Sequence, residues 1–569
     1  MKFLLFFCSK DSTNFWKSWN KKYRHKVPPV PSIDGCSDSS SIADVFKRFY
    51  SNVFIDSSSD RKAAAEFAEV FLRLDKLDKS IPDANIEIIE RCIKGLKLNK
   101  AAGYDGIVTE HIIHSHPSLV VHIKLLFTMI MRHCYVPEGF GLGVIIPIAK
   151  DTRGDLTSSD NYRPITLSSI FSKLFESFLL ENYSPLLPSD NLQFGFKKKV
   201  GCAQPISVLR QIIEYFNNRD SNVYVASIDA SKAFDRVNHY KLFSILISKG
   251  LPYVFICTII NWYNKLFVTV KWNDSYSDSW KVDSGVRQGG ILSPILFNFY
   301  VNSIIVSLRE LDLGCHLHGL FLGCIMYADD LLLLSASVQA LQLMLDRCGV
   351  VGSELGITFN VSKSCCIAIG PIPFVSVNAK MTLCNMPISW QCKCKYLGVT
   401  LLSGKHFNID LSEIRRKFFV SCNLILSKCS YVSEPAKLKL VEAHCLPILL
   451  YAIESLNLSR VDLAEINSWW NSVYRKIFNF NKWESVKQLI CLLGRLDVLH
   501  LENIRRIHFI KKMLASCTGV NNTVKFILTK YIPNGEFTFV LKKFDSQFDW
   551  SLMKIKAMSF NSFKAIATA

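Results

Sequence analysis

Apolar residues along this chain recur at two spacings, and the two spacings separate predicted helices from predicted strands. In the run 86–96, IEIIERCIKGL, they return every three or four residues as on one helix face, and 119–131 repeats that spacing. The runs 143–150, GVIIPIAK, and 221–229, SNVYVASID, are short and rich in β-branched residues, as strands are. The pattern therefore predicts a chain in which helices and strands are interleaved.

Further elements are predicted toward the C-terminus. Residues 161–183 predict a loop that enters a long helix, and 267–282 predict a hairpin, which is followed by a helix from about 293. Residues 324–337, CIMYADDLLLLSAS, predict two short strands that meet at an acidic pair. From about 411 onward the chain becomes mostly helical and basic, so a helical unit is expected there.

The first 80 residues differ from the rest in composition. They contain Ser-rich and Pro-containing pieces such as VPPVPSIDGCSDSSS, which are typical of linkers. We therefore predict a linker or N-terminal extension over 1–80, an α/β unit over 81–407, and a helical unit with the C-terminal region over 408–569.

Composition and charge point to a particular kind of partner. With 569 residues, of which 49% are hydrophobic and 12% aromatic, the chain can bury a sizeable core and is too long for one compact unit. Its 67 Lys and Arg against 48 Asp and Glu give a net charge of +19, which favours a polyanionic partner such as nucleic acid. Simple solubilising charge is the alternative explanation.

The cysteines and the N-terminus favour an intracellular protein. The 19 cysteines lie mainly inside apolar runs, as buried thiols in a reducing compartment do. The pairs Cys365 with Cys366 and Cys392 with Cys394 are too closely spaced for a zinc knuckle. MKFLLFFCSK is too short for a signal peptide, and no stretch reaches the roughly 18 apolar residues that span a bilayer, so no membrane partner is expected.

Three carboxylates stand at the ends of predicted strands: Asp229, Asp329 and Asp330. Apolar residues flank the acidic pair on both sides, whereas a surface turn with two acids has polar neighbours. A buried carboxylate is costly unless it is paired or bound to a metal, and two adjacent acids cannot neutralise each other. Magnesium prefers such oxygen ligands, and two ions roughly 4 Å apart would support phosphoryl transfer.

The segments around these acids are IDASKAFD at 228–235, GVRQGGILSPILFNFYVN at 285–302 and YADD at 327–330. Supporting segments occur along the chain in the order KAAGYDGI, IIPIAK, NYRPITL, KLFE, QFGFKKKVG, LGITFNVSKS, YLGVTL and LPILLYAIESL. In content and order they resemble the motifs of reverse transcriptases from non-LTR, LINE-type retrotransposons, and jockey-like elements are the most similar in style. The resemblance covers roughly 86–470.

This resemblance implies a fold and a set of catalytic groups. The implied fold is a right-hand polymerase of the α/β (α+β) class, with fingers and palm over 81–407, the palm being an antiparallel sheet with helices, and a helical thumb from about 408. Asp229, Asp329 and Asp330 would be the catalytic carboxylates and metal ligands, with Asp229 and Asp329 the main ligands.

The resemblance also assigns contacts with the incoming nucleotide. Phe234 would lie under the sugar 2′ position, where its ring would clash with a 2′-hydroxyl and select deoxynucleotides; a packed core Phe is the alternative. Arg163 would hold the triphosphate through its guanidinium, unless it is only a surface Arg. Gln288 and Gly289 would contact the nucleotide and the template base.

Two sets of lysines have weaker assignments. Lys363 would donate a proton to leaving pyrophosphate, with a solvated loop Lys as the alternative. Lys197, Lys198 and Lys199 would contact a nucleic-acid backbone or else form a solvated charge run.

The implied activity is RNA-directed DNA polymerisation, a nucleotidyl transfer that extends a primer 3′-hydroxyl with dNTPs. The implied cofactor is a pair of Mg²⁺ ions, with Mn²⁺ as a substitute, and the partners are an RNA template and a DNA primer. An active element would work in the nucleus, with the cytoplasm as the alternative. Such elements carry an endonuclease before the polymerase, and the first 80 residues are too short for one, so that activity is expected to be absent from this chain.

Two other interpretations stay open. The first is a catalytically inactive, nucleic-acid-binding relic of such an element, against which stands the intact set of three acids. The second is an intron-maturase-type reverse transcriptase, which would be expected to depart from the phrase RQGGILSPILFNFYVN.

Overall fold

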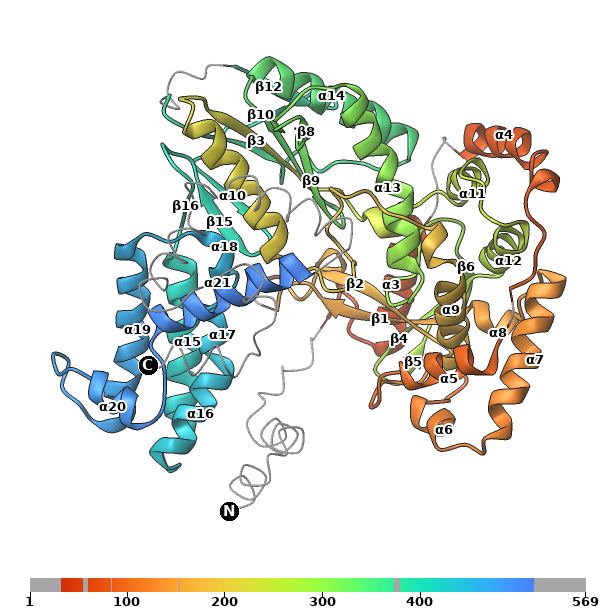
Figure 1. Ribbon diagram of the computed structural model, residues 1–569. Coiled ribbons are helices and arrows are strands. Elements are labelled where there is room, and N and C mark those ends of the chain that lie inside the picture. The colour runs from red at the N-terminus through yellow and green to blue at the C-terminus, as the bar shows by residue number, and fades with distance from the viewer. Residues whose placement is uncertain (1–31, 55–59, 83, 153, 373–378, 516–569) are drawn as a thin grey trace.

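Two groups of helices flank a central set of strands (Figure 1). The computed structural model describes residues 32–54, 60–82, 84–152, 154–372 and 379–515. One group contains α4 Asp60–Phe71, α5 Ile86–Lys94, α6 Thr109–Ile113, α7 Ser118–His133, α8 Glu138–Gly141, α9 Ile170–Tyr183, α11 His239–Ser248 and α12 Tyr253–Tyr263. The other contains α15 Ser412–Lys428, α16 Glu434–His444, α17 Leu446–Leu449, α18 Ile453–Leu456, α19 Arg460–Phe478, α20 Lys487–Leu492 and α21 Val498–Ala515.

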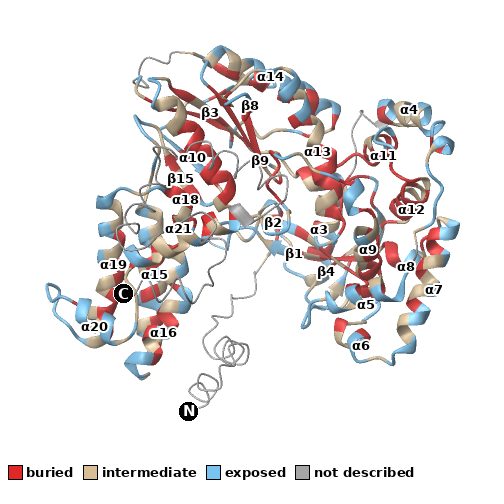
Figure 2. Cartoon of the chain, in the orientation of Figure 1, coloured by how far each residue is buried: buried red, intermediate tan, exposed pale blue. Residues whose placement is uncertain are grey.

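The central sheet has four antiparallel strands in the order β11-β3-β10-β9. These strands are β3 Val223–Ile228, β9 Cys324–Tyr327, β10 Asp330–Ser335 and β11 Cys365–Ile369. Helices α10 Ala203–Asn217 and α14 Val338–Glu354 pack against the sheet, and α13 Ser293–Glu310 packs against α14. Most residues of these strands are buried (Figure 2). The predicted antiparallel sheet with helices is confirmed.

A second sheet follows the order β2-β1-β4-β5, with β6 joined to β4. Its strands are β1 Leu142–Ala149, β2 Tyr162–Ser168, β4 Phe267–Trp272, β5 Ser275–Tyr276 and β6 Trp280–Lys281. The prediction of a loop before the long helix is wrong for β2, which pairs antiparallel with β1 over its whole length. Pro164 is tolerated there because β2 is an edge strand. Proline lacks a backbone N–H, and on the unpaired side of an edge strand no inter-strand hydrogen bond is lost.

The remaining strands that the structure describes form three small sheets. The three-stranded sheet has the order β14-β15-β16, and two further pairs are β7-β8 and β12-β13. Their bounds are β7 His316–Leu317, β8 Leu320–Phe321, β12 Met381–Leu383, β13 Met386–Ile388, β14 Lys393–Tyr396, β15 Val399–Leu402 and β16 Asn408–Ile409.

Helix α3, Ser39–Val53, belongs to the core of the fold. Asp38 caps its start by accepting hydrogen bonds from the backbone N–H groups of Ser40 and Ser41. Its amphipathic run IADVFKRFYSNVF buries Phe46 and Tyr50 against β4. The prediction of a linker over 1–80 is therefore wrong for this helix and for α4, which packs on α11. Residues 1–31 of that region lie outside the described residues.

Replacing Phe46 by Ala should lower the free energy of unfolding by about 3–5 kcal/mol, because it leaves a cavity in a packed aromatic cluster. Phe46 is fully buried, and its ring centroid lies 5.1 Å from that of Tyr162 and 5.2 Å from that of Trp272. Chemical denaturation measures the change. Leu72→Ala is the control, since Leu72 is 80% exposed and should cost less than about 0.5 kcal/mol. Equal losses in the two variants would contradict the place of α3 in the core.

The helices from 412 onward form a core of their own, as the sequence predicts. Phe418, Trp470 and Tyr474 are buried at its centre, and the rings of Trp470 and Tyr474 lie edge to face with centroids 5.5 Å apart. Helix α18 joins this group to the central sheet by packing on α10. None of the helices in the described ranges is long and apolar enough to cross a membrane.

Candidate active site

The three predicted carboxylates lie at one end of the central sheet. Asp229 directly follows β3, Asp329 lies in the two-residue turn between β9 and β10, and Asp330 is the first residue of β10. The ladder pairs Leu331 with Ile228, so the end of β3 and this turn are neighbours. Two segments that are far apart in the sequence thus bring their acids to one edge.

A cavity of about 760 Å³ lies at this edge, and two of the three acids line it. Asp229 and Asp329 line it and are partly buried. Asp330 is exposed and does not line it. The structure therefore brings Asp229 and Asp329 into one cavity and leaves Asp330 outside its lining.

The carboxylates repel one another. Burial, followed by the nearby Asp229 charge, raises the pKa of Asp329, and the positive charge of Arg163 opposes this rise. Although Asp330 is exposed to solvent, the protein around its carboxyl displaces part of the surrounding water, and this desolvation together with the charges of Asp329 and Asp229 raises its pKa to about 6. A cation bound between these carboxylates would offset the negative charge that disfavours the ionised form of Asp329.

The donor set fits a hard divalent cation. Asp229 and Asp329 offer carboxylate oxygens to a shared cavity, and Mg²⁺ is commonly held by one or two carboxylates together with water and substrate phosphates. Within the described ranges, no three or more His, Cys, Asp or Glu side chains are grouped as a metal site. A cation held by these two carboxylates would take its remaining ligands from phosphate oxygens and water.

Six cations line the same cavity: Lys150, Arg163, Lys232, Arg236, Arg287 and Lys363. Arg163 and Lys363 were predicted from the sequence, and Lys363 Nζ lies 3.9 Å from Asp229 Oδ2. Burial lowers the pKa of Lys150, and the positive charges of Lys232, Lys363 and Arg163 lower it further, against the opposing charge of Asp160. A cluster of cations beside two carboxylates that could hold a metal ion is suited to a polyphosphate.

The sequence analysis missed Lys150 and Lys232, although both lie inside quoted segments, IIPIAK and IDASKAFD. Lys232 has a left-handed backbone with φ of 51°, and its Nζ lies 4.3 Å from the ring centroid of Phe49. Phe49 belongs to α3, which also contributes Tyr50 and Val53 to the cavity wall. Because this contact joins residues that are far apart in sequence, local patterns could not reveal it.

Phe234 lies in the cavity wall, as the resemblance implies. Its ring stacks on that of Phe297, with centroids 4.2 Å apart and planes inclined by 14°. Phe297 is fully buried, so it forms a rigid backing for the half-exposed ring in front of it. Stacking on Phe297 therefore holds the ring of Phe234 in the wall of the cavity that Asp229 also lines.

The loop with Gln288 and Gly289 also lines the cavity and is held from two sides. Gln288 Nε2 donates to Asp235 Oδ1 at 2.7 Å, and the Gln288 carbonyl accepts from the N–H of Thr166 at 2.8 Å. Gly289 has φ of 118°, and a Cβ there would lie 2.7 Å from the carbonyl oxygen of Thr166. Only glycine fits that approach between the loop and β2.

A buried ion pair supports this loop from behind, and the sequence analysis did not assign it. Arg287 Nη2 lies 3.5 Å from Glu176 Oε1, and both side chains are more than nine-tenths buried. Glu176 also accepts hydrogen bonds from the N–H groups of Ile291 and Leu292. The segment KLFE, which contains Glu176, thus holds the loop that carries Gln288 and Gly289.

The three lysines at 197–199 do not share one role. Lys197 Nζ donates to the carbonyl oxygens of Ser189 at 3.3 Å and Asp190 at 2.6 Å, so it ties down its own loop. Lys198 and Lys199 are exposed. A nucleic-acid contact stays a prediction for those two, and the structure gives Lys197 a structural use.

Replacing Asp235 by Asn should stabilise the metal-free protein at pH 8 by up to about 3 kcal/mol. Burial raises the pKa of Asp235 to about 6, against the opposing hydrogen bond from Gln288. The folded state then holds this proton more tightly than the unfolded state, so the wild type loses stability as pH rises from about 4 to about 6. Denaturant unfolding at pH 4 and 8 measures the difference, which should vanish at the lower pH; an equal effect at both would contradict the assignment.

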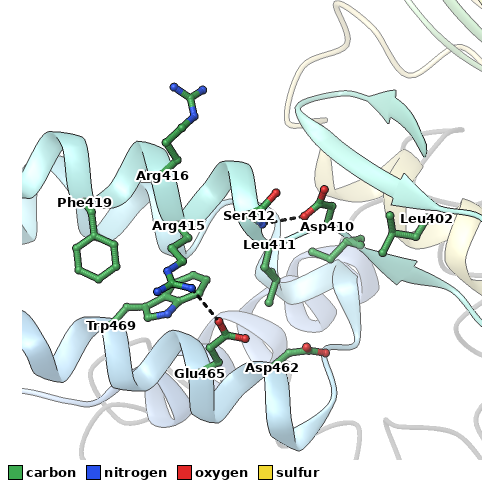
Figure 3. Close-up of a pocket in the computed structure, with 11 residues that line it drawn as sticks. Leu402, Asp410, Leu411, Ser412, Arg415, Arg416, Phe419, Asp462, Glu465 and Trp469 are labelled. Atoms are coloured by element: carbon green, nitrogen blue, oxygen red, sulfur yellow. Dashed lines mark hydrogen bonds and ion pairs between the residues drawn. The ribbon is translucent and has the colours of Figure 1, made fainter. Parts of the chain in front are cut away.

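A second cavity of about 520 Å³ lies between the start of α15 and α19 and contains none of the predicted site residues (Figure 3). Arg415 points toward Glu465, at 3.9 Å, and lies over the ring of Trp469, whereas Arg416 points away (Figure 3). Asp410 accepts from the N–H of Ser412 at 2.9 Å. These polar contacts lie where the chain passes from the sheet β14-β15-β16 into α15.

The fold and the first cavity together define a protein of the right-hand polymerase class. Residues 148–401 match the family described as "Reverse transcriptase (RNA-dependent DNA polymerase)". This part of the chain is a reverse transcriptase domain of the kind found in non-LTR retrotransposons.

Three relatives illustrate the similarity. The "Retrovirus-related Pol polyprotein from type-1 retrotransposable element R2" of Nasonia vitripennis is 28% identical over 56% of this chain and 31% of that protein. The "Probable RNA-directed DNA polymerase from transposon BS" of Drosophila melanogaster is 25% identical over 66% and 43%. The "Transposon TX1 uncharacterized 149 kDa protein" of Xenopus laevis is 21% identical over 88% and 39%.

The chain spans less than half the length of each of these relatives. Because both R2 elements and transposon BS match, the similarity supports the non-LTR class without separating the jockey-like branch within it. A telomerase structure from Candida albicans superposes on 73% of this chain with 12% identity and a TM-score of 0.37, which supports no conclusion.

Proposed function

We propose that this protein synthesises DNA on an RNA template by extending a primer 3′-hydroxyl with dNTPs. The observation that carries the proposal is the single cavity in which Asp229 and Asp329 face Arg163, Lys150, Lys232 and Lys363. Paired acids can hold the metal ions of phosphoryl transfer, and cations beside them can hold a triphosphate. The reverse transcriptase match over 148–401 supports RNA as the template.

Each cavity residue has a proposed task. Asp229 and Asp329 would hold two Mg²⁺ ions, with Mn²⁺ as a substitute, and the bound ions would activate the primer hydroxyl and stabilise the leaving oxygen. Arg163, Lys150 and Lys232 would bind the triphosphate oxygens. Their charges would also offset the negative charge that develops on the leaving pyrophosphate.

The remaining groups would orient the nucleotide. Phe234, backed by Phe297, would exclude a 2′-hydroxyl from the sugar position. Gln288 and Gly289 would contact the nucleotide and the template base from the loop that Glu176 and Asp235 hold. Lys363, which is exposed and lies 3.9 Å from Asp229, would donate a proton to the departing pyrophosphate.

The partners proposed are an RNA template and a DNA primer, bound across a chain whose net charge is +19. Lys198 and Lys199 are exposed candidates for backbone contacts. The helical group from about 408 would act as the thumb, and residues 81–407 would form the fingers and palm. Helix α3 packs on β4 and would belong to the same unit as the fingers and palm. For an active element, we place the reaction in the nucleus.

Primer extension on a defined RNA template tests the proposal. The purified chain, with Mg²⁺ and dNTPs, should produce DNA that is complementary to the RNA, and the Asp229→Asn, Asp329→Asn double variant should produce none. Salt-dependent RNA binding without incorporation in either Mg²⁺ or Mn²⁺ would overturn the proposal and favour the inactive nucleic-acid-binding relic.

A further inference from the structure

The turn that carries Asp329 contains an unusual backbone conformation. Asp330 pairs with Tyr327 across the β9–β10 hairpin, which leaves Ala328 and Asp329 as its two turn residues. Ala328 has φ of 57° and is 93% buried. A left-handed conformation at the first position of a two-residue hairpin turn favours glycine, so an alanine there needs support from its surroundings.

The side chain of Gln193 provides that support through both polar groups of Ala328. Gln193 Oε1 accepts from the N–H of Ala328 at 2.9 Å, and Gln193 Nε2 donates to the carbonyl oxygen of Ala328 at 3.1 Å. The same Oε1 accepts from the N–H of Gly195 at 2.9 Å. Gln193 has no exposed surface, so water does not compete for these three hydrogen bonds.

These hydrogen bonds fix the backbone from which the side chain of Asp329 extends. The carbonyl of Ala328 and the N–H of Asp329 belong to one planar peptide unit, and the N–H of Ala328 belongs to the preceding unit. A side chain that holds both the N–H and the carbonyl of Ala328 fixes the two peptide planes on either side of it. The Cα of Asp329, and with it the start of the carboxylate side chain, is then held relative to the sheet.

The segment that carries Gln193 is itself anchored. The N–H of Phe194 donates to the carbonyl of Met326 at 2.7 Å, and the N–H of Met326 donates to the carbonyl of Leu192 at 2.9 Å, so this segment runs beside β9. A Cβ on Gly195 would lie only 2.3 Å from the backbone nitrogen of Ala328. The segment therefore packs directly against the turn, with no room for a side chain between them.

Helix α13 holds this segment from the other side. Asn298 Nδ2 donates to the carbonyl of Gly195 at 2.8 Å, and Asn302 Oδ1 accepts from the N–H of Asp190 at 3.0 Å. Asp190 also forms an ion pair with Arg309, with Nη1 and Oδ2 2.8 Å apart. Because α13 begins just after the loop of Gln288 and Gly289, one helix supports both that loop and the segment behind the catalytic turn.

We propose that Gln193 is a positioning residue for catalysis, which fixes the backbone of Ala328 so that the Asp329 carboxylate faces the cavity. The proposal rests on the proposed function for its kinetic consequences, whereas the hydrogen bonds to the turn are independent of it. Gln193 lies in QFGFKKKVG, a segment for which the sequence analysis considered only the lysines.

A matched control lies eleven residues further along the chain. Gln204 is also buried, and its Oε1 accepts from the N–H of Gly201 at 2.9 Å while its Nε2 donates to the carbonyl of Lys199 at 3.3 Å. It holds a backbone turn in the same manner without any hydrogen bond to the β9–β10 hairpin. Gln204→Ala therefore reports what the loss of a buried glutamine costs when the catalytic turn is left alone.

The experiment compares Gln193→Ala with Gln204→Ala in the full chain by two measurements. The first is hydrogen exchange of a peptide covering 325–333, without metal or nucleic acid, which should be faster by at least about tenfold only in Gln193→Ala. The second is single-nucleotide incorporation, in which Gln193→Ala should lose about 100-fold in kcat, with the KM for dNTP changed by less than about threefold. Gln204→Ala should keep kcat within about threefold of the wild type.

Gln193→Glu serves as a second variant if Gln193→Ala does not fold. Its carboxylate can still accept from the N–H groups of Ala328 and Gly195 but cannot donate to the carbonyl of Ala328, so faster exchange and a lower kcat are expected again. Unchanged exchange of 325–333 in the folded variant, or equal effects in Gln204→Ala, would overturn the proposal. A wild type without incorporation, combined with faster exchange in the Gln193 variant, would instead refute the proposed function and leave the backbone support of the turn established.

Discussion

Replacing Asp329 by Asn is expected to reduce RNA-templated primer extension by about 1,000-fold or more, which corresponds to about 4 kcal/mol of lost transition-state stabilisation. Asp329 lines the cavity together with Asp229, whose charge, with burial, raises the pKa of Asp329. Asn keeps the size of the side chain and removes both the charge and the repulsion, so the folded structure should persist. Single-turnover extension at saturating dNTP measures the loss, and thermal unfolding confirms the fold.

Asp330→Asn is the matched control for this result. Asp330 is adjacent in sequence, but it is exposed and lies outside the cavity lining, so its replacement should cost only roughly tenfold. An equal loss of activity in the two variants would contradict the distinction between an acid that faces the cavity and one that lies beside it.

Replacing Phe234 by Val should raise the ratio of ribonucleotide to deoxynucleotide incorporation by about 100-fold. The ring of Phe234 lines the cavity and is held by stacking on Phe297, so it cannot turn aside for a 2′-hydroxyl. Val leaves an open space at that position and keeps an apolar surface. The kcat/KM values for one complementary rNTP and dNTP on the same primer and template give the ratio.

Phe297→Leu separates this selection from simple packing. Phe297 is fully buried behind Phe234, and Leu keeps an apolar side chain against that ring, so its replacement should lower stability while changing the nucleotide ratio by less than about threefold. If Phe297→Leu admitted ribonucleotides as well as Phe234→Val does, the wall formed by Phe234 would not be the source of selection.

The sequence predicts the central part of this site because its elements are short and their ends are marked by acids. The alternation in 223–228 stops at Asp229, and the apolar runs on either side of YADD leave only a turn between them. Such ends can be located from local residues alone. The order of the motifs then predicts further residues of the site, such as Phe234 and Gln288, and both lie in the cavity wall.

Contacts between distant segments could not be predicted in this way. Neighbouring residues of an extended chain point in different directions, so Asp329 and Asp330 cannot be assumed to share a cavity. Lys197 looks like its two neighbours in a charge run, and only the position of the 189–190 carbonyls shows that it turns inward. Phe49 and Gln193 act through contacts with residues that are far away in sequence.

The most direct test of the central claim is single-turnover incorporation of one complementary dNTP onto an RNA-templated primer over a range of Mg²⁺ concentrations. The account predicts that incorporation is absent in EDTA, rises to saturation with Mg²⁺, and is lost in Asp229→Asn and Asp329→Asn while RNA binding persists. Incorporation that survives either substitution, or a wild type that binds the primer and template but adds no nucleotide at any Mg²⁺ concentration, would contradict it.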